Sequence, residues 1–271
     1  DRMNERFDEF YFERDEIVPG AFVEYTYKPK ETFSVVAGIR SDYNSIFGWS
    51  VTPRLHSKYR FNKENTVVRV SSGLGRRTAN PLAQFQQVFV SNRVLDIQGT
   101  DWSLPYGLQQ ENALNSGISF SHEFRIGYMP TTLGLDYFNT VFFNEVLLDR
   151  ETAGAAFIYN VENGTRSNSF QAQLDVQPAR RTDIRLAYRL FDVQSNYQNL
   201  GYLERPFISK HRGFIYVTQS TRNHWQLSTT ATWYGPQRIP GAYSLNEPLP
   251  LPPPVTEYAP SFLLRNLQVS K

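Results

Sequence analysis

Residues 51–70 read VTPRLHSKYRFNKENTVVRV, and they contain two alternating segments on either side of a short polar stretch. Successive side chains of a β-strand point to opposite faces. An extended segment from Val51 to Arg60 therefore has one basic face and one mostly apolar face. The basic face carries Thr52, Arg54, His56, Lys58 and Arg60, and the other carries Val51, Pro53, Leu55, Ser57 and Tyr59. We predict a hairpin here, with its turn at FNKEN (61–65).

The same period of two recurs along most of the chain, and helical periodicity is scarce. Short polar connections alternate with long ones, which predicts an antiparallel meander with tight turns at one end and large loops at the other. Further alternating segments are 21–28, 32–40, 114–124, 169–177, 183–190 and 224–234. The short connections lie near 27–31, 61–65, 128–132, 177–182 and 219–223, and the long ones span roughly 41–50, 75–113, 143–165, 193–208 and 235–260.

Composition is compatible with a membrane barrel and excludes several other classes. The 271 residues carry a formal net charge of only +2, which argues against a nucleic-acid-binding surface, and they contain no cysteine for disulfides or thiolate metal sites. A transmembrane strand needs only about 9–11 residues, half of them apolar, so a mean hydropathy of −0.46 does not exclude one. Aromatic residues gather near the strand ends, for example Tyr25, Tyr27, Tyr59 and Phe61. We predict an all-β, antiparallel transmembrane β-barrel segment of about twelve strands.

Residues 38–84 and three later segments resemble a known family, the TonB-dependent outer-membrane receptors. The resemblance rests on Gly38–Asp42 (GIRSD), Thr52–Leu55 (TPRL), Gly73–Gly75 (GLG) and Asn80–Pro81, followed by 109–124, 133–149 and 166–178. It implies a barrel of about 22 strands in the bacterial outer membrane, with short periplasmic turns and long extracellular loops. We expect residues 1–271 to be the C-terminal part of such a barrel, without the family's N-terminal plug domain and without a signal peptide.

Signatures of catalysis are missing from the sequence. It contains no G-x-S-x-G, H-E-x-x-H or P-loop motif, and no two of its four histidines have the spacing of metal ligands. We therefore expect no enzyme activity, no catalytic residue, no metal site and no cofactor.

The charged faces of the predicted strands are expected to point into the lumen, because an Arg in lipid costs roughly 2–4 kcal/mol at the midplane. These side chains would contact the plug or line a solute path, or they would only solvate a water-filled lumen and pair across strands. The predicted lumen-facing residues are Arg40, Arg54, His56, Lys58, Arg69, Glu123, Asp175, Arg185 and Arg189, with Glu24, Arg60 and Asp136 among their neighbours.

Candidate solute-binding residues lie in the predicted outer loops. Arg76 and Arg77 could bind an anionic ligand such as a ferric siderophore, or lipopolysaccharide phosphates. Trp49, Trp102 and Tyr106 could stack on sugars. We also expect a short helix at NPLAQFQQVF (80–89) and a stiff polyproline II stretch at EPLPLPPPV (247–255).

The resemblance implies a TonB-energised uptake receptor for a scarce solute, such as a ferric siderophore or a similar iron complex. The implied partners are the receptor's own plug domain, the TonB complex, the small solute and outer-membrane lipid or lipopolysaccharide, with no nucleic acid. Three alternatives stay open: an oligosaccharide-importing receptor of the same family, a passive porin-like barrel, and a soluble β-rich carbohydrate-binding protein or adhesin.

Overall fold

A computed structural model describes residues 2–7, 10–61, 65–88, 90–241 and 257–271. Strands dominate it, and the helices are single short turns. The long strands are β3 (Gly20–Lys30), β4 (Phe33–Asn44), β5 (Gly48–Phe61), β6 (Thr66–Arg77), β8 (Glu111–Ile126), β9 (Met129–Asp149), β10 (Ala155–Ala179), β11 (Thr182–Tyr197), β13 (His211–Ser220), β14 (Gln226–Tyr234) and β17 (Phe262–Ser270). The shorter elements are β1 (Arg2–Phe7), β2 (Phe10–Asp15), α1 (Pro81–Gln84), η2 (Gln86–Val88), β7 (Val94–Ile97), η3 (Pro105–Gly107), β12 (Gly201–Glu204), β15 (Gln237–Arg238) and β16 (Tyr258–Ala259).

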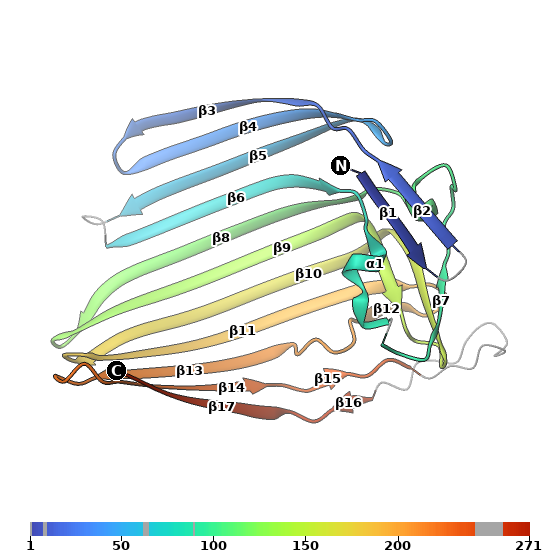
Figure 1. Ribbon diagram of the computed structural model, residues 1–271. Helices are drawn as coiled ribbons and strands as arrows, with labels where there is room; N and C mark the ends of the chain where they lie inside the picture. Colours follow the sequence, from blue (N-terminus) through green and yellow to red (C-terminus); the bar gives the residue numbers. More distant parts are fainter. Residues whose placement is uncertain (1, 8–9, 62–64, 89, 242–256) are drawn as a thin grey trace.

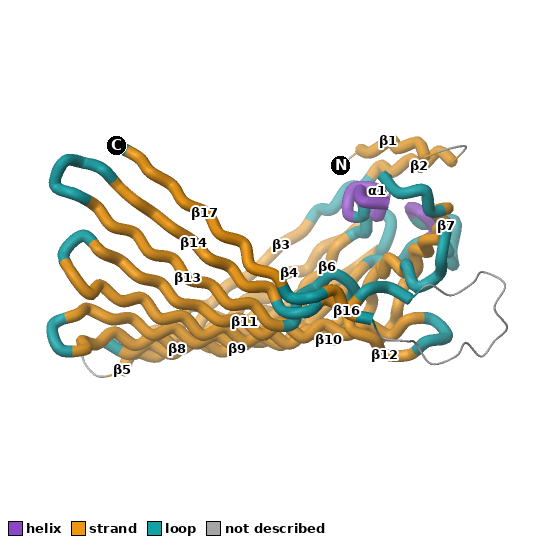
Figure 2. Tube along the Cα trace, turned by 90° about the horizontal axis from the view of Figure 1, so that it is seen from below, coloured by secondary structure: helices purple, strands orange, loops and turns teal. Residues whose placement is uncertain are grey.

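The long strands form one antiparallel sheet in the order β17-β14-β13-β11-β10-β9-β8-β6-β5-β4-β3, and β12 and β7 pair with it at the side. Each strand on this path lies beside a neighbour in the chain, as the alternating pattern predicts. The tight turns gather at one end of the sheet and the larger connections at the other (Figure 1). Among the described residues β3 and β17 are the two edges, so the sheet is an open segment of a barrel and curves like a trough (Figure 2).

Strand register assigns each side chain to a face of the sheet. Residues directly opposite each other in neighbouring strands share a face. One such row runs across eight strands through Glu24, Gly38, Arg54, Gly73, Asn115, Thr140, Ser167 and Val193. This is the concave face, over which α1 and the β1–β2 hairpin lie at the outer end (Figure 2).

On the convex face, an apolar band extends from the tight turns to a row of polar residues near the outer end. A groove of about 410 Å³ crosses it, lined by residues such as Leu174, Leu186, Ile215 and Trp233. Asn139 lies on this face, where its side chain donates to Asn168 Oδ1 at 2.8 Å. Asn139 is roughly ten residues from the start of β9, which at a strand tilt near 40° gives an apolar band of about 25 Å, the height of a membrane barrel's lipid-facing surface.

The outer connections contain more regular structure than the sequence predicts. The segment predicted as a loop at 41–50 is almost entirely strand, and only residues 45–47 form a turn between β4 and β5. Strands β9 and β10 also continue far into the predicted loop at 143–165. Backbone amide and carbonyl groups need hydrogen-bond partners, and extended pairing supplies them where an irregular loop would not.

Beyond the apolar band, the β9–β10 ribbon is buried on both sides. Val146 and Leu148 pack with Leu82, Val88 and Tyr106 from the segment that follows β6. The intervening residue, Leu147, packs on the opposite side with Tyr159, Val161 and Tyr197. The predicted helix at 80–89 is present in part: the Asn80 side chain caps α1 by accepting from the Ala83 amide at 3.2 Å, and the chain then turns into η2.

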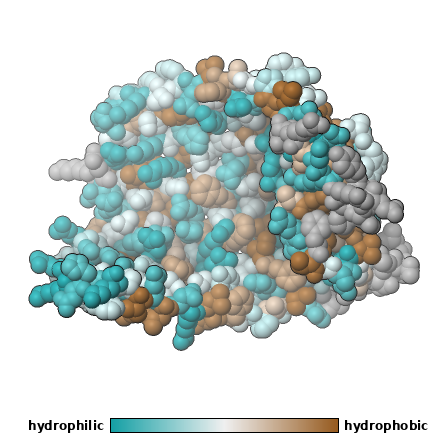
Figure 3. All heavy atoms as spheres, viewed as in Figure 1, coloured by the Kyte–Doolittle hydropathy of each residue, from teal (hydrophilic) through white to brown (hydrophobic). Residues whose placement is uncertain are grey.

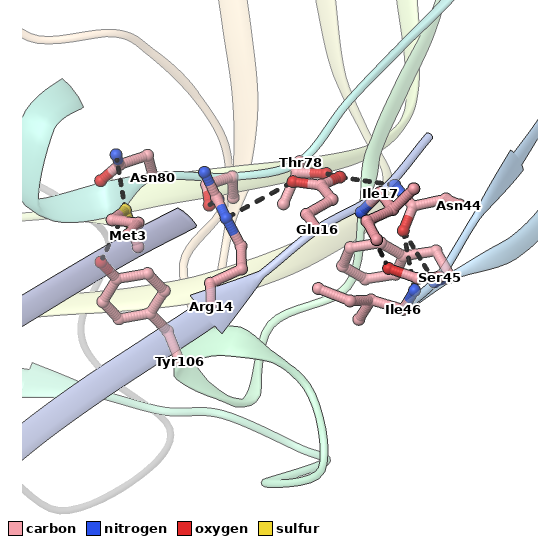
Figure 4. Close-up of polar contacts among 12 residues, drawn as sticks. Met3, Arg14, Glu16, Ile17, Asn44, Ser45, Ile46, Thr78, Asn80 and Tyr106 are labelled. Carbon is pink, nitrogen blue, oxygen red and sulfur yellow. Dashed lines mark hydrogen bonds and ion pairs between the residues drawn. The ribbon is translucent and has the colours of Figure 1, made fainter. Parts of the chain in front are cut away.

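The β1–β2 hairpin is attached to the outer end through a buried carboxylate. Glu16 accepts hydrogen bonds from Asn44 Nδ2 at 2.5 Å and Thr78 Oγ1 at 2.7 Å, and Arg14 lies 3.4 Å from it (Figure 4). These contacts join the segment after β2 to the ends of β4 and β6. The polyproline stretch predicted at 247–255 lies outside the described residues. No helix in the described parts of the chain has the length and apolarity to cross a membrane.

Adjacent positions on β10 test the assignment of faces. Leu174→Arg places a guanidinium on the convex apolar band and should lower the free energy of unfolding by about 2–4 kcal/mol. Gln173→Arg, the matched control, points to the concave face near Asp175 and should change it by less than about 1 kcal/mol. Urea unfolding of the intact protein in lipid vesicles measures both. Equal losses in the two variants would contradict the assignment.

Candidate functional site

The concave face carries all nine residues that the sequence analysis predicts as lumen-facing. Their positions follow from the register with the row through Arg54 and Ser167. Hydrophilic side chains are spread over this face among apolar ones (Figure 3). The set is Arg40, Arg54, His56, Lys58, Arg69, Glu123, Asp175, Arg185 and Arg189, and Glu24, Arg60 and Asp136 share the face.

Carboxylates neutralise several of these arginines locally. Arg40 pairs with Asp42 at 2.8 Å within β4, and Arg54 of β5 pairs with Glu24 of β3 at 2.5 Å. On the other side of the trough, Arg185 Nε lies 2.6 Å from Asp175. Because these side chains are largely accessible to solvent, each ion pair contributes little to the free energy of folding. Their effect is to fix where charge is displayed along the wall.

The Arg54–Glu24 pair spans an intervening strand because Gly38 lies between the two residues. Gly38 is the direct partner of both, and a Cβ atom added to it would lie 2.8 Å from Arg54 Nε. Glycine thus leaves the path across β4 open for the guanidinium. The alternating pattern assigns Arg54 to this face, but the role of Gly38 depends on the register of three strands.

The basic row in the opening stretch is less compensated. Lys58 of β5 lies directly opposite Arg69 of β6, so two like charges face each other near the tight-turn end. Ser119 follows Arg69 in the row, and Asp136 comes after it on β9. Lys58 and Arg69 therefore leave a stretch of uncompensated positive charge on β5 and β6.

Arg76 and Arg77, the candidate anion-binding residues, lie at the outer end of β6. Both lie in β6 and not in the outer loop, so alternation directs them to opposite faces. Arg77 pairs with the buried Glu111 of β8, with Nε 2.7 Å from Oε2. That both guanidinium groups bind one anion stays a prediction, and the divergence of neighbouring strand residues does not favour it.

The three aromatic candidates are separated. Trp49 lies in β5 and not in a loop, and its ring contacts Tyr43 on the convex face. Tyr106 is 1% exposed, packs with Phe12 and donates to Glu5, so it is a core residue. Trp102 is exposed in the turn before η3. Of the three, only Trp102 is both exposed and in an outer connection.

Two arginines that the sequence did not single out, the half-buried Arg93 and the buried Arg238, hold the outer connections together. Arg93 donates from Nη1 to the carbonyl groups of Arg150, Thr152 and Ala155 at 2.7–3.1 Å. Arg238 forms a two-pronged ion pair with Glu151, and both side chains are at most 3% exposed. Neither arginine has a local pattern that distinguishes it from a surface residue.

Burial shifts the pKa values of two groups next to this ion pair, which lies beyond the apolar band. Burial raises the pKa of the Asp149 carboxyl and lowers the pKa of the Arg150 guanidinium. The Gly241 amide also donates to Glu151 Oε2 at 2.6 Å, so the carboxylate ties the β9–β10 connection to the segment after β15. The outer end is thus a cross-braced structure above the wall. Within the described parts of the chain, no cluster of His, Asp and Glu has the makeup of a metal site.

Comparison with known proteins gives a family and several similar folds. The family described as TonB dependent receptor-like, beta-barrel, matches residues 4–271. The ferric enterobactin receptor PfeA of Pseudomonas aeruginosa is similar with a TM-score of 0.67 and 16% identity, over 94% of this chain and 37% of PfeA. The siderophore receptor PirA of Acinetobacter baumannii gives 0.65 and 11%, over 97% of this chain and 40% of PirA.

The iron transporter FrpB of Neisseria meningitidis has a TM-score of 0.63 and 10% identity, over 93% of this chain and 38% of FrpB. This chain therefore spans well under half the length of these three proteins. At such low identities the similarity concerns the fold. No curated protein matches the sequence.

The buried pair at the outer end should be far more important for stability than the exposed pair on the wall. Glu151→Ala leaves Arg238 buried without its carboxylate and should cost about 3–5 kcal/mol. Glu24→Ala, the matched control, removes the partner of the exposed Arg54 and should cost about 0–1 kcal/mol. Hydrogen exchange at the Gly241 amide and denaturant unfolding report the two effects. Similar losses in both variants would show that the outer brace is not buried as described.

Proposed function

The chain belongs to the TonB-dependent receptor β-barrel family, and we propose that it forms part of the barrel wall of an energised outer-membrane uptake receptor. The proposed solute is a ferric siderophore or a similar iron complex. Similar folds include proteins described as a ferric enterobactin receptor, a siderophore receptor and an iron transporter, which supports this choice of solute class.

The observation that carries the proposal is the sorting of charge between the two faces. Nine charged or basic residues from six strands share the concave face, while the convex face presents an apolar groove to its surroundings. A wall of this kind suits a hydrated path through lipid. A soluble adhesin has no reason to expose such a band on its convex side.

In the proposed cycle the solute binds at the outer end and the barrel performs no chemistry of its own. A plug domain closes the lumen, and energy from the TonB complex displaces it so that the solute passes along the concave wall. The proposed partners are therefore the plug, the TonB complex, the solute and outer-membrane lipid or lipopolysaccharide. Strands beyond β3 and β17 would pair with these edges, because lipid does not tolerate unpaired backbone groups.

The positions of the three aromatic candidates do not support the oligosaccharide alternative. Sugar stacking needs exposed rings that converge on one site. Tyr106 is in the core and Trp49 is on the convex face, which leaves Trp102 without the other two. An iron complex needs no such aromatic platform, so it remains the proposed solute class.

Uptake of radiolabelled iron complexes by whole cells tests the proposal. Cells that produce the intact receptor should accumulate iron from at least one siderophore complex, and cells lacking its gene should not. Accumulation should stop when TonB is deleted or the proton gradient is collapsed. Uptake that persists without TonB would favour a passive barrel, and receptor-dependent uptake of an oligosaccharide in place of iron would favour the glycan importer.

A further inference from the structure

A row of four side chains crosses the concave face on the last strands of the sheet. Arg189 of β11 lies directly opposite Arg212 of β13, Arg212 opposite Tyr234 of β14, and Tyr234 opposite Phe262 of β17. Arg212 is near the outer end of the short strand β13, and Arg189 is near the middle of β11. We call this row the Arg–aromatic row.

The two arginines of the row face each other without a carboxylate. Within the described residues, neither Arg189 nor Arg212 has an acidic partner, whereas Arg40, Arg54 and Arg185 each have one. Like charges directly opposite each other across two strands destabilise the sheet. A bound anion would remove this repulsion, and the paired wall arginines do not need one.

The guanidinium group of each arginine lies over an aromatic ring. The Arg189 guanidinium carbon lies 4.4 Å from the centre of the Phe191 ring, and that of Arg212 lies 4.4 Å from the centre of the Tyr234 ring. Tyr234 stacks in turn on Phe262, with ring centres 4.8 Å apart and planes 11° apart. A ring covers only the face of a guanidinium and leaves its N–H edge free to bind a planar anion through two hydrogen bonds.

The groups around the row do not neutralise it. Gln171 of β10 lies opposite Arg189 on its other side, and Thr232 and Leu264 occupy the next concave positions on β14 and β17. Asp136 of β9 lies opposite Gln171 in the same row, about 10 Å from Arg189 across two strands, and no ion pair joins Asp136 to Arg189 in the described residues. Asp175 on β10 is about 13 Å along the strand from Gln171, and it pairs with Arg185. Asp192 and Glu204, which bind Lys210, belong to the convex side by alternation.

The Lys58–Arg69 pair provides an internal comparison. It is also a like-charge pair across two strands, but no aromatic ring covers either side chain in the described parts of the chain. The concave face therefore carries two pairs of directly opposed positive charges, Lys58–Arg69 and Arg189–Arg212. Among the residues that the structure describes, the Arg–aromatic row alone combines two uncompensated guanidinium groups with a continuous aromatic surface.

From this combination we infer that the Arg–aromatic row binds a planar aromatic anion, such as an aryl carboxylate group of the transported solute. Arg189 and Arg212 hold the negative group, and the solute's ring lies against the exposed Phe262 and the edge of Tyr234, whose two faces are covered by Arg212 and Phe262. The inference rests on the proposed function, because it assigns a chemical class to the solute. It makes Arg189 and Arg212 selectivity residues of the wall.

Binding of small probes to the intact purified receptor tests this inference separately from iron uptake. Benzoate should bind the wild-type protein in ligand-observed NMR, whereas benzamide, which is uncharged, and cyclohexanecarboxylate, which is not aromatic, should bind at least about tenfold more weakly. Arg189→Gln and Arg212→Gln should each weaken benzoate binding about tenfold. Arg222→Gln, in the turn between β13 and β14, removes the same charge at a distance and should leave binding unchanged.

The urea unfolding midpoint of the ligand-free barrel gives a second readout. A merely structural role of Arg212 would lower this midpoint on substitution, whereas the inference predicts that it rises. Removing one of two uncompensated like charges should make the empty barrel more resistant to urea, so Arg212→Gln should raise the unfolding midpoint while it weakens benzoate binding. A lowered midpoint would mean that another part of the protein neutralises the pair, and this would overturn the inference. Unchanged benzoate binding in the Arg189→Gln/Arg212→Gln double variant, or no binding by wild type, would also overturn it. Failure of iron uptake with intact benzoate binding would count against the proposed function alone.

Discussion

Pairing of backbone amide and carbonyl groups between neighbouring strands is the constraint on which the rest of this structure depends. A bilayer offers these groups no water, so each strand needs a partner along its whole membrane crossing. Once the pairing register is set, alternation assigns every side chain of a strand to the convex or the concave face. A slip of one residue in β11 would move Arg185 and Arg189 to the apolar face, and the cost of placing them there keeps the register in place.

Register also decides how charge is distributed along the lumen wall. Arg54 reaches Glu24 across β4 because a glycine lies at the crossing point, and Arg185 reaches Asp175 on the next strand. Arg189 and Arg212 form no ion pair within the described residues, and aromatic rings lie beside their guanidinium groups, so their charge stays available. The wall is thus divided into neutralised and cationic stretches that the small net charge of the chain does not reveal.

The outer end follows different physics from the membrane band. There water competes for the backbone and both faces of the β9–β10 ribbon can be covered, so Val146 and Leu147 are both buried although they point in opposite directions. A buried Arg–Glu pair adds little net stability compared with an apolar contact, but loss of one partner is costly. The Glu151–Arg238 pair therefore selects one arrangement of the connections, and the mouth above the wall is held in a defined shape.

The sequence by itself determined the strand class, the order of the meander and the face of each wall residue, because alternation is a local property that every short segment carries. It also predicted a short helix at 80–89, of which the Asn80-capped turn α1 is present, since capping is local as well. It did not determine the fate of Tyr106, the divergence of Arg76 and Arg77, or the brace between Glu151 and Arg238. Those depend on contacts between segments far apart in the chain, 87 residues for the brace and 101 for Tyr106 and Glu5, and on exact strand ends. Only the tertiary structure decides such contacts, because burial and pairing partners are set by register and packing and not by the neighbouring sequence.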